Sequence, residues 1–353
     1  MSGPVLRVEG LTKHFPVRRG VLRRQVGLVQ AVSDVSFSVA AGETLAIVGE
    51  SGCGKSTTGR AVLRLLEPTA GTVTLDGEEI TALDASRLRA ARRQMQMVFQ
   101  DPFGSLNPRM TVREVVAEPL VLHGVATGAN VEPRVIELLT LVGLSDYHAD
   151  RYPHEFSGGQ RQRICIARAL ATRPRLVVCD EPVSALDVSV QAQIVNLLKD
   201  LQQQFGLAYV FISHDLAIVR HIATRVCVMY LGRIVEEGTT AEIFANPRHP
   251  YTRALIAAAP RPVPGIPPNR EEVTGDAPSA LNPPSGCAFH PRCPLAGDRC
   301  RQERPELRPL GASAVACHFA EDSAALSDAP EAPPAPLLMR RLETLHAART
   351  SSA

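Results

Sequence analysis

The chain is poor in lysine and lacks the segments that would carry it into or across a membrane. Only three lysines stand among its 353 residues, against 35 arginines. No run of about 18 apolar residues occurs, so we expect no membrane-spanning helix. The first residues show no basic stretch followed by an apolar one, which argues against an export signal and for a cytoplasmic protein. A net charge of +2 gives no electrostatic reason to expect nucleic acid as a partner.

The sequence does contain enough apolar material for a large packed core. Hydrophobic residues make up 45% of the chain, and its length predicts one large domain with an appendage, or two domains. Continuous apolar segments at 44–48, 176–179 and 208–212 predict parallel strands that are buried on both faces. A helical pattern over 189–205 separates the last two strands, which indicates an α/β fold.

Other segments predict smaller elements around this core. Alternating apolar residues at 5–9 and 31–39 predict strands, with a basic insertion at 18–24 between them. We expect this insertion to be a solvated loop, with contact to phospholipid headgroups or a partner as the alternative. The stretch 111–145 is helical in pattern, and we expect breaks at Pro119, Gly124 and Pro133.

One of the three lysines lies in a glycine-rich loop. Residues 49–57 match G-x-x-x-x-G-K-[ST], between the strand at 44–48 and a helix expected at 57–66. In that context backbone N–H groups and the helix N-terminus bind phosphate oxygens, a lysine reaches the β and γ phosphates, and the hydroxyl holds Mg²⁺. We therefore expect a nucleoside triphosphate site formed by Gly49, Glu50, Ser51, Gly52, Cys53, Gly54, Lys55, Ser56 and Thr57.

Two further segments carry groups suited to phosphate chemistry. Asp180 and Glu181 follow directly after the apolar strand at 176–179. In this position the first carboxylate binds Mg²⁺, usually through water, and the second polarises the attacking water. The segment 157–160, with its two glycines, opens a helix and predicts a second anion-binding N-terminus.

With these elements in this order, residues 5–245 resemble the ATP-binding cassette (ABC) ATPases. The segment 156–160 is similar to that family's signature, with Phe156 where leucine is commoner. Gln100 resembles the Q-loop glutamine, which senses Mg²⁺ and contacts the membrane subunit's coupling helix. Asp187, in segment 184–187, resembles the D-loop aspartate, and His214 resembles the switch histidine. Phe15 is similar to the aromatic residue that stacks on adenine.

The resemblance implies a P-loop NTPase fold over residues 1–245: a mixed or parallel sheet core, an antiparallel β subdomain, and a helical subdomain at about 101–172. It also implies a head-to-tail dimer, in which the phosphate loop of one subunit and the signature of the other hold each ATP. The signature residues are Ser157, Gly158, Gly159 and Gln160. Glu181 and His214 are then the catalytic residues, and Mg²⁺ is bound through Ser56, Gln100 and Asp180.

The character of the chain changes after residue 245. Segments 246–255 and 287–294 resemble the region that follows the ATPase domain in oligopeptide and dipeptide importers of the peptide/nickel group. We therefore expect residues 246–319 to form a small irregular C-terminal region that includes the proline-rich stretch 260–286. Residues 320–353, rich in alanine, proline and acidic side chains, predict a disordered tail.

Four cysteines lie close together in this region, with five, six and sixteen residues between them: Cys287, Cys293, Cys300 and Cys317. Four thiolates can ligate a [4Fe–4S] cluster or a zinc ion. The absence of the zinc spacing C-x₂-C favours the iron–sulfur cluster, while zinc and free thiols remain open. A reducing compartment disfavours a disulfide.

The resemblance implies an ATPase subunit that energises import of dipeptides or oligopeptides, bound peripherally at the cytoplasmic face of the membrane. Its partners would be two transmembrane permeases, a second related ATPase and an extracytoplasmic binding protein, with a heterodimer favoured over a homodimer. Import of nickel chelates or glutathione is the alternative. An exporter ATPase or a soluble ATPase of translation or DNA repair is disfavoured, since no second cassette and no long coiled coil is apparent.

Overall fold

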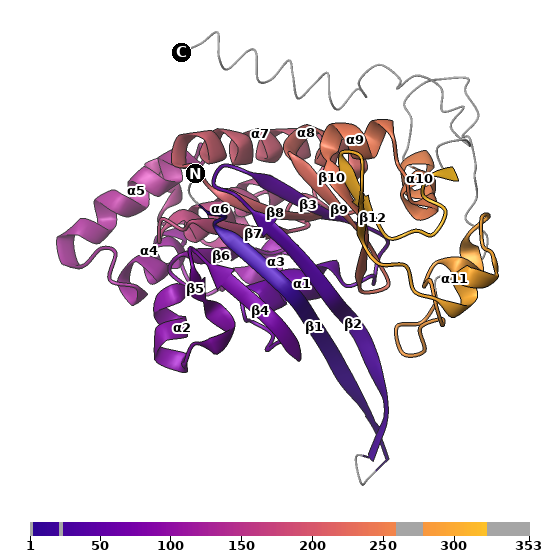
Figure 1. The fold of residues 1–353 in the computed structure, drawn as a ribbon. Helices are drawn as coiled ribbons and strands as arrows, with labels where there is room; N and C mark the ends of the chain where they lie inside the picture. Colours follow the sequence, from indigo (N-terminus) through magenta and orange to yellow (C-terminus); the bar gives the residue numbers. More distant parts are fainter. Residues whose placement is uncertain (1–2, 21–23, 259–277, 323–353) are drawn as a thin grey trace.

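The computed structural model describes residues 3–20, 24–258 and 278–322, and an eight-stranded sheet lies at its centre (Figure 1). Its strand order is β11-β12-β10-β9-β3-β8-β7-β6. The five strands from β9 to β6 pair in parallel. The other three extend the sheet with antiparallel pairings, of β10 with β9, β12 with β10, and β11 with β12. The strands are β3 (Thr44–Val48), β6 (Met95–Val98), β7 (Leu176–Asp180), β8 (Ala208–Ser213), β9 (Arg225–Tyr230), β10 (Arg233–Thr239), β11 (Arg308–Leu310) and β12 (Ser313–Val315).

The central strands are apolar throughout because both of their faces are covered. Along β7, Val177 and Cys179 pack into the core beneath the helices, whereas Leu176 and Val178 pack into a second core on the opposite face. This confirms the prediction of buried parallel strands. The helices are α1 (Lys55–Val62), α2 (Ala85–Ala91), α3 (Pro102–Ser105), α4 (Val112–Leu122), α5 (Val131–Leu141), α6 (Gly158–Leu170), α7 (Val188–Phe205), α8 (Leu216–Ile222), α9 (Thr240–Ala245), α10 (Pro250–Ala257) and α11 (Asp298–Gln302). None of these described helices is long and apolar enough to cross a bilayer.

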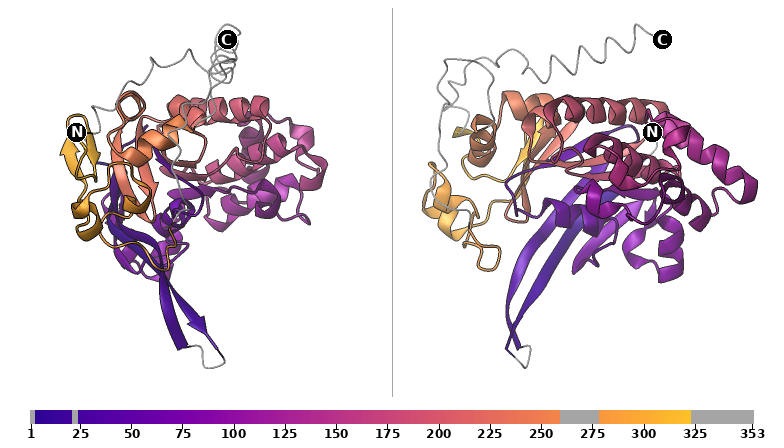
Figure 2. Two further views of the ribbon diagram at one scale, coloured as in Figure 1. Left: turned by 90° about the vertical axis from the view of Figure 1, so that its right-hand side faces the viewer. Right: turned by 180° about the vertical axis from the view of Figure 1, so that it is seen from behind.

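A separate antiparallel sheet packs against α1, which lies between it and the central sheet. It has the order β2-β1-β4-β5, with β1 at Leu6–Arg19, β2 at Arg24–Val39, β4 at Ala70–Leu75 and β5 at Glu78–Glu79. β1 and β2 extend as a long hairpin away from the body of the molecule (Figure 1 and Figure 2). The prediction of a basic loop at 18–24 was therefore wrong at its ends, since Arg18 and Arg24 are exposed strand residues. Register shifts in this hairpin interrupt the regular alternation on which the prediction depended.

The helical part between β6 and β7 differs from the prediction at two prolines. Pro133 lies in the first turn of α5 rather than at a break, and Pro119 lies inside α4. We expected Pro119 to break the helix, but α4 continues through it, and the His123 N–H donates to the Pro119 carbonyl at 3.1 Å. A proline inside a helix removes one backbone hydrogen bond. Burial of Val115, Val116 and Leu120 on either side of the proline offsets that loss.

The C-terminal region attaches to the central sheet and is mostly irregular. β12 pairs with β10, so that Val315 lies opposite Glu236, and β11 completes the edge. Phe289 joins a core with Tyr230 and Tyr251, each at most 2% exposed. Most of the predicted proline-rich stretch and tail, at 259–277 and 323–353, lies outside the described residues.

Candidate active site

The phosphate loop joins the end of β3 to the start of α1. Gly49 and Gly54 have φ angles of +154° and +106°, which side chains with a Cβ rarely adopt. A Cβ on Gly54 would lie 2.1 Å from the Ala31 carbonyl oxygen, and one on Gly49 would lie 2.2 Å from the Met229 carbonyl oxygen. Only glycine fits at these two positions. α1 begins at Lys55, two residues before the predicted start, and ends at Val62 rather than at residue 66.

Lys55 is buried at the base of this loop. Its side chain is 5% exposed, and its Nζ donates to the carbonyl oxygens of Gly49 at 2.7 Å and Glu50 at 2.9 Å. Within the part of the chain that the structure describes, no carboxylate pairs with this ammonium group. Because its partners are uncharged carbonyls, the positive charge of Lys55 is available to a phosphate.

Ser56 and Asp180 form a pair suited to a divalent cation. The Ser56 hydroxyl donates to Asp180 Oδ1 at 2.7 Å, and Asp180 is fully buried at the end of β7. Its second oxygen, Oδ2, has no hydrogen-bond donor among the described residues, and the nearest cation is Arg60 Nη2 at 3.8 Å. Burial raises the pKa of the Asp180 carboxyl. A buried carboxylate oxygen that lacks a donor, beside a hydroxyl, fits the oxygen ligands that Mg²⁺ prefers.

Three predicted residues meet at the ends of neighbouring parallel strands. The Gln100 side-chain amide donates to Glu181 Oε2 at 2.8 Å, and His214 Nδ1 lies 3.2 Å from Glu181 Oε1. These residues follow β6, β7 and β8, whose carboxyl ends lie at one edge of the sheet. Glu181 has a φ of +45°, an unusual value for a residue with a side chain. Such conformations cluster at functional sites, where the surrounding structure holds them in place.

The signature segment lies elsewhere in the same chain. Ser157 caps α6, accepting from the Gln160 N–H at 3.4 Å, while its own N–H donates to Gln160 Oε1 at 3.1 Å. Gly159 leaves no room for a Cβ, which would lie 2.4 Å from Val190 Cγ1. Among the described residues, no hydrogen bond or ion pair connects segment 157–160 with the phosphate loop or Glu181.

Two other predicted residues also stand apart from the phosphate loop. Asp187 is exposed and precedes α7, where its carbonyl accepts from the Val190 N–H at 2.9 Å. Phe15 is half-buried on β1, and the Lys13 ammonium group lies 5.0 Å from its ring centroid. One chain therefore brings together the predicted phosphate, Mg²⁺ and water-activating residues. Among the described residues, no hydrogen bond or ion pair joins the signature segment to them.

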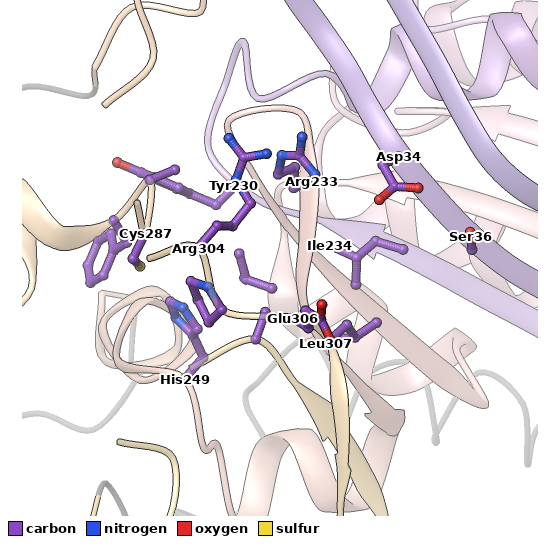
Figure 3. A pocket seen from close by; sticks show the side chains of 15 residues that line it. Asp34, Ser36, Tyr230, Arg233, Ile234, His249, Cys287, Arg304, Glu306 and Leu307 are labelled. Carbon is purple, nitrogen blue, oxygen red and sulfur yellow. The ribbon is translucent and has the colours of Figure 1, made fainter. Parts of the chain in front are cut away.

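A cavity of about 600 Å³ lies away from this edge, between β10 and the C-terminal region (Figure 3). Its lining includes Arg233 and Arg304, together with Asp34, His249 and Cys287. No residue of the phosphate loop lines it. We therefore assign the nucleotide site to the sheet edge, where the predicted phosphate-binding groups are, and not to this cavity.

The four C-terminal cysteines lie in one region but do not form a metal site in this structure. Burial raises the pKa of the Cys293 thiol to about 11 and that of Cys317 to about 12, and the nearby cysteines contribute to both shifts. Across the described residues, no group of three or more histidine, cysteine or acidic side chains is close enough to hold a metal ion. The structure therefore does not support the predicted [4Fe–4S] cluster or the zinc alternative.

Sequence patterns missed three residues at this edge of the sheet. Arg60 lies beside the Asp180 carboxylate, at 3.8 Å, on the helix that follows the phosphate loop. Arg292 and Tyr251 contact Glu50 of that loop from more than 200 positions further along the chain. The helical spacing offered a weak signal for Arg60, whereas no local pattern points to the other two.

The sheet topology and the groups at its edge define a nucleotide-binding ATPase of the ABC type. The family model for ABC transporters matches residues 32–184, and that for the oligopeptide/dipeptide transporter C-terminal region matches residues 235–300. The chain is 52% identical over 319 residues to the oligopeptide transport ATP-binding protein AppF of Bacillus subtilis, covering 89% of this chain and 97% of that protein. It is 50% identical over 317 residues to the di/tripeptide transport ATP-binding protein DppF of Pseudomonas aeruginosa, covering 90% and 98%.

A solved dimer of the ATP-binding cassette MJ0796, in a post-hydrolysis state with ADP and Pi, has the same fold. The TM-score is 0.59 and the identity 31%, over 67% of this chain and 98% of that one. The chain therefore belongs to the ATP-binding subunits of ABC transporters, in the oligopeptide/dipeptide transporter family. The predicted α/β cassette fold is confirmed.

Proposed function

We propose that this chain is the ATP-hydrolysing subunit of an importer for dipeptides or oligopeptides. The main observation behind this proposal is that Gln100 and His214 both contact Glu181, next to the hydrogen-bonded pair Ser56 and Asp180. In this proposal Glu181 orients or deprotonates the attacking water, and His214 steadies the γ-phosphate. Lys55 offsets the negative charge that develops in the transition state. Ser56, Gln100 and Asp180 would hold Mg²⁺, which would supply positive charge to offset the negative charge of the phosphates.

The signature segment has no described hydrogen bond to the phosphate loop of its own chain, and this supports a dimer. Ser157–Gln160 and Asp187 face the nucleotide of a second subunit in this proposal, and Phe15 stacks on adenine in its own chain. Residues 1–245 are the ATPase domain, with the helical subdomain at about 101–172, and 246–319 are the transporter-type C-terminal region. We favour a related but distinct ATPase as the second subunit.

A groove of about 390 Å³ between α4 and the central sheet supports a membrane partner. It is lined by Phe99, the neighbour of Gln100, and by Leu65 and Leu122, which are 45% and 65% exposed. Exposed apolar side chains around a groove are typical of protein-docking surfaces. We propose that a cytoplasmic helix of a permease docks here, so that closure of the ATPase dimer moves the permease. The chain would then lie peripherally at the cytoplasmic face of the membrane.

The names of the relatives support peptides as the transported substrate, since AppF and DppF are named for oligopeptide and di/tripeptide transport. Selectivity would lie in two permeases and an extracytoplasmic binding protein, not in this chain. Import of nickel chelates or glutathione by the same machinery is the alternative substrate class.

The finer cofactor proposal is a [4Fe–4S] cluster held by the C-terminal thiols, with zinc as the alternative. Four cysteines within one short region support it, although their side chains would have to move together to ligate the cluster. Iron, acid-labile sulfide and zinc measured after anaerobic purification test it. Zinc without iron and sulfide would select the alternative, and the absence of all three would leave free thiols. No step of ATP hydrolysis depends on this group.

Affinity capture from native membranes tests the functional proposal. The Glu181→Gln variant, purified in detergent with ATP, should retain its partners because the ATP-bound dimer persists when hydrolysis is slow. We expect two multi-span permeases, a second ATPase and a binding protein by mass spectrometry. Capture of ribosomal or DNA-repair proteins, with no membrane subunit, would contradict the importer and leave only the ATPase.

A further inference from the structure

Glu50, the second residue of the phosphate loop, is held from outside the ATPase domain. Both Nη atoms of Arg292 donate to the Glu50 carboxylate, at 2.9 Å to Oε2 and 3.1 Å to Oε1. The Tyr251 hydroxyl accepts from the Glu50 N–H at 2.8 Å. Lys55 Nζ donates to the Glu50 carbonyl at 2.9 Å. All three polar parts of this residue are thus engaged, two of them by the C-terminal region.

Arg292 is itself fixed before any nucleotide arrives. Its side chain is 9% exposed, and its guanidinium carbon lies 6.0 Å from the ring centroids of both Tyr230 and Phe289. Tyr230 packs against Tyr251 and Phe289 with centroid distances of 4.6 Å and 5.3 Å. A short 3-10 turn, His290–Arg292, sets its backbone, and the Arg292 N–H donates to the Phe289 carbonyl at 3.0 Å. The guanidinium therefore reaches Glu50 from a rigid support.

The charge of Glu50 gives this contact a consequence for nucleotide binding. The Glu50 side chain is 34% exposed and belongs to the loop that would receive the ATP phosphates. An unpaired carboxylate there would repel those phosphates. Arg292 neutralises it, and its planar fork fixes both oxygens in a way that an ammonium group does not.

We propose that Arg292 is a positioning residue of the nucleotide site, which neutralises Glu50 and sets the conformation of the phosphate loop for ATP. The inference depends on the proposed nucleotide site. It makes the C-terminal region a contributor to ATP affinity rather than an appendage. Arg292 ends the turn, three positions after Phe289 and next to Cys293. A change in the packing of this turn then alters how well the phosphate loop binds nucleotide.

A comparison of single and double variants of the full chain tests this role. We expect Arg292→Gln to weaken binding of a fluorescent ATP analogue with Mg²⁺ by about five- to tenfold, because Glu50 is left unpaired. Glu50→Gln combined with Arg292→Gln should return the affinity to within about twofold of wild type, because the excess charge is gone. Arg292→Lys should fall between these two. Arg299→Gln, which removes an exposed arginine paired with Glu303 in the same region, is the matched control and should change nothing.

The kinetic readout separates positioning from damage to the fold. Arg292→Gln should raise KM for ATP and leave kcat at saturating ATP unchanged, whereas a variant that had lost its fold would also lose kcat. A double variant as weak as Arg292→Gln alone, or no effect of Arg292→Gln, would overturn the proposal. The Lys55→Ala variant distinguishes failure of the proposed nucleotide site from failure of the proposed role of Arg292. If it binds ATP like wild type, the nucleotide site itself is wrong, whereas a loss with Lys55→Ala but none with Arg292→Gln rejects only the role of Arg292.

Discussion

The nucleotide edge is the edge of the central sheet that carries Gln100, Glu181 and His214, and it contacts the C-terminal region at Glu50. Different interactions hold each of these two regions in place. At the edge, neighbouring parallel strands deliver Gln100, Glu181 and His214 to one place, and the backbone of the sheet fixes their spacing. Residues 278–322 have little regular structure and are held by one strand pairing, an aromatic core and the Arg292–Glu50 ion pair. The first arrangement is set by topology and the second by side-chain packing, so the two regions should respond differently to substitution.

The largest expected effect is at the nucleotide edge. Glu181→Gln should lower ATP turnover by about 100- to 10,000-fold, because it removes the group that we propose activates water. ATP binding should stay within about twofold of wild type, since the amide keeps the shape of the side chain. Steady-state ATPase assays and equilibrium binding measure the two effects. Glu78→Gln, at an exposed residue paired with Arg87, is the control. Hydrolysis by Glu181→Gln near the wild-type rate would reject the catalytic assignment.

A matched pair of core substitutions sharpens the comparison between the regions. Phe211 on β8 is 0% exposed and Phe289 in the C-terminal region is 1% exposed. Replacement of either by alanine should cost about 3–5 kcal/mol of packing. We expect Phe211→Ala to lower the unfolding temperature of the whole chain, and Phe289→Ala to expose mainly residues 278–322 to protease. Equal protection of both regions in the two variants would show that they unfold as one unit.

Two glycines of the phosphate loop test its close packing. Gly54→Ala places a Cβ 2.1 Å from the Ala31 carbonyl oxygen, whereas Gly52→Ala meets nothing within 4 Å. Both have positive φ, so each substitution carries backbone strain, but only the first also forces the loop away from β2. We expect ATP binding about 10- to 100-fold weaker in Gly54→Ala and only a few-fold weaker in Gly52→Ala. Similar losses in both variants would mean that strain, not packing, governs the loop.

The last expected effect concerns pH and the attachment of the C-terminal region. His249 is 1% exposed, its Nδ1 accepts from the Tyr251 N–H at 3.0 Å, and burial lowers its pKa from 6.5 to about 3. Between these two values the unfolded chain binds the extra proton. The buried neutral His249 therefore costs no stability above pH 6.5. As the pH falls from 6.5 toward 3, the free energy of unfolding drops by about 1.4 kcal/mol per pH unit, because the unfolded chain gains a proton that the folded chain does not.

His249→Gln should flatten this part of the stability profile in urea unfolding measured from pH 7.5 to 5. The same change at exposed His154 should leave the profile as it is. A profile with the wild-type slope in His249→Gln would show that another group controls the acid sensitivity.

The sequence predicted most of the nucleotide edge because its determinants are local. A loop of fixed spacing defines residues 49–57, and buried strands that end in polar residues predict that Glu181 and His214 share an edge. The long hairpin was missed because register shifts break its alternation. The continuation of α4 through Pro119 depends on tertiary burial that no local pattern reveals.

The contact between Glu50 and Arg292 could not be predicted, because 242 positions separate the two residues. The pairing of β12 with β10 escapes sequence patterns for a different reason, because β12 has only three residues. Where function depends on such distant contacts, only the folded chain reveals it.

Uptake of a radiolabelled dipeptide tests the central claim most directly. Cells that lack this chain would be supplied with the wild-type chain or with Glu181→Gln, expressed at equal levels. We predict that the wild-type chain restores uptake and that Glu181→Gln restores none, because ATP hydrolysis at the edge of the sheet energises import in this proposal. Equal uptake with both chains, or no dependence of uptake on this chain, would contradict the account.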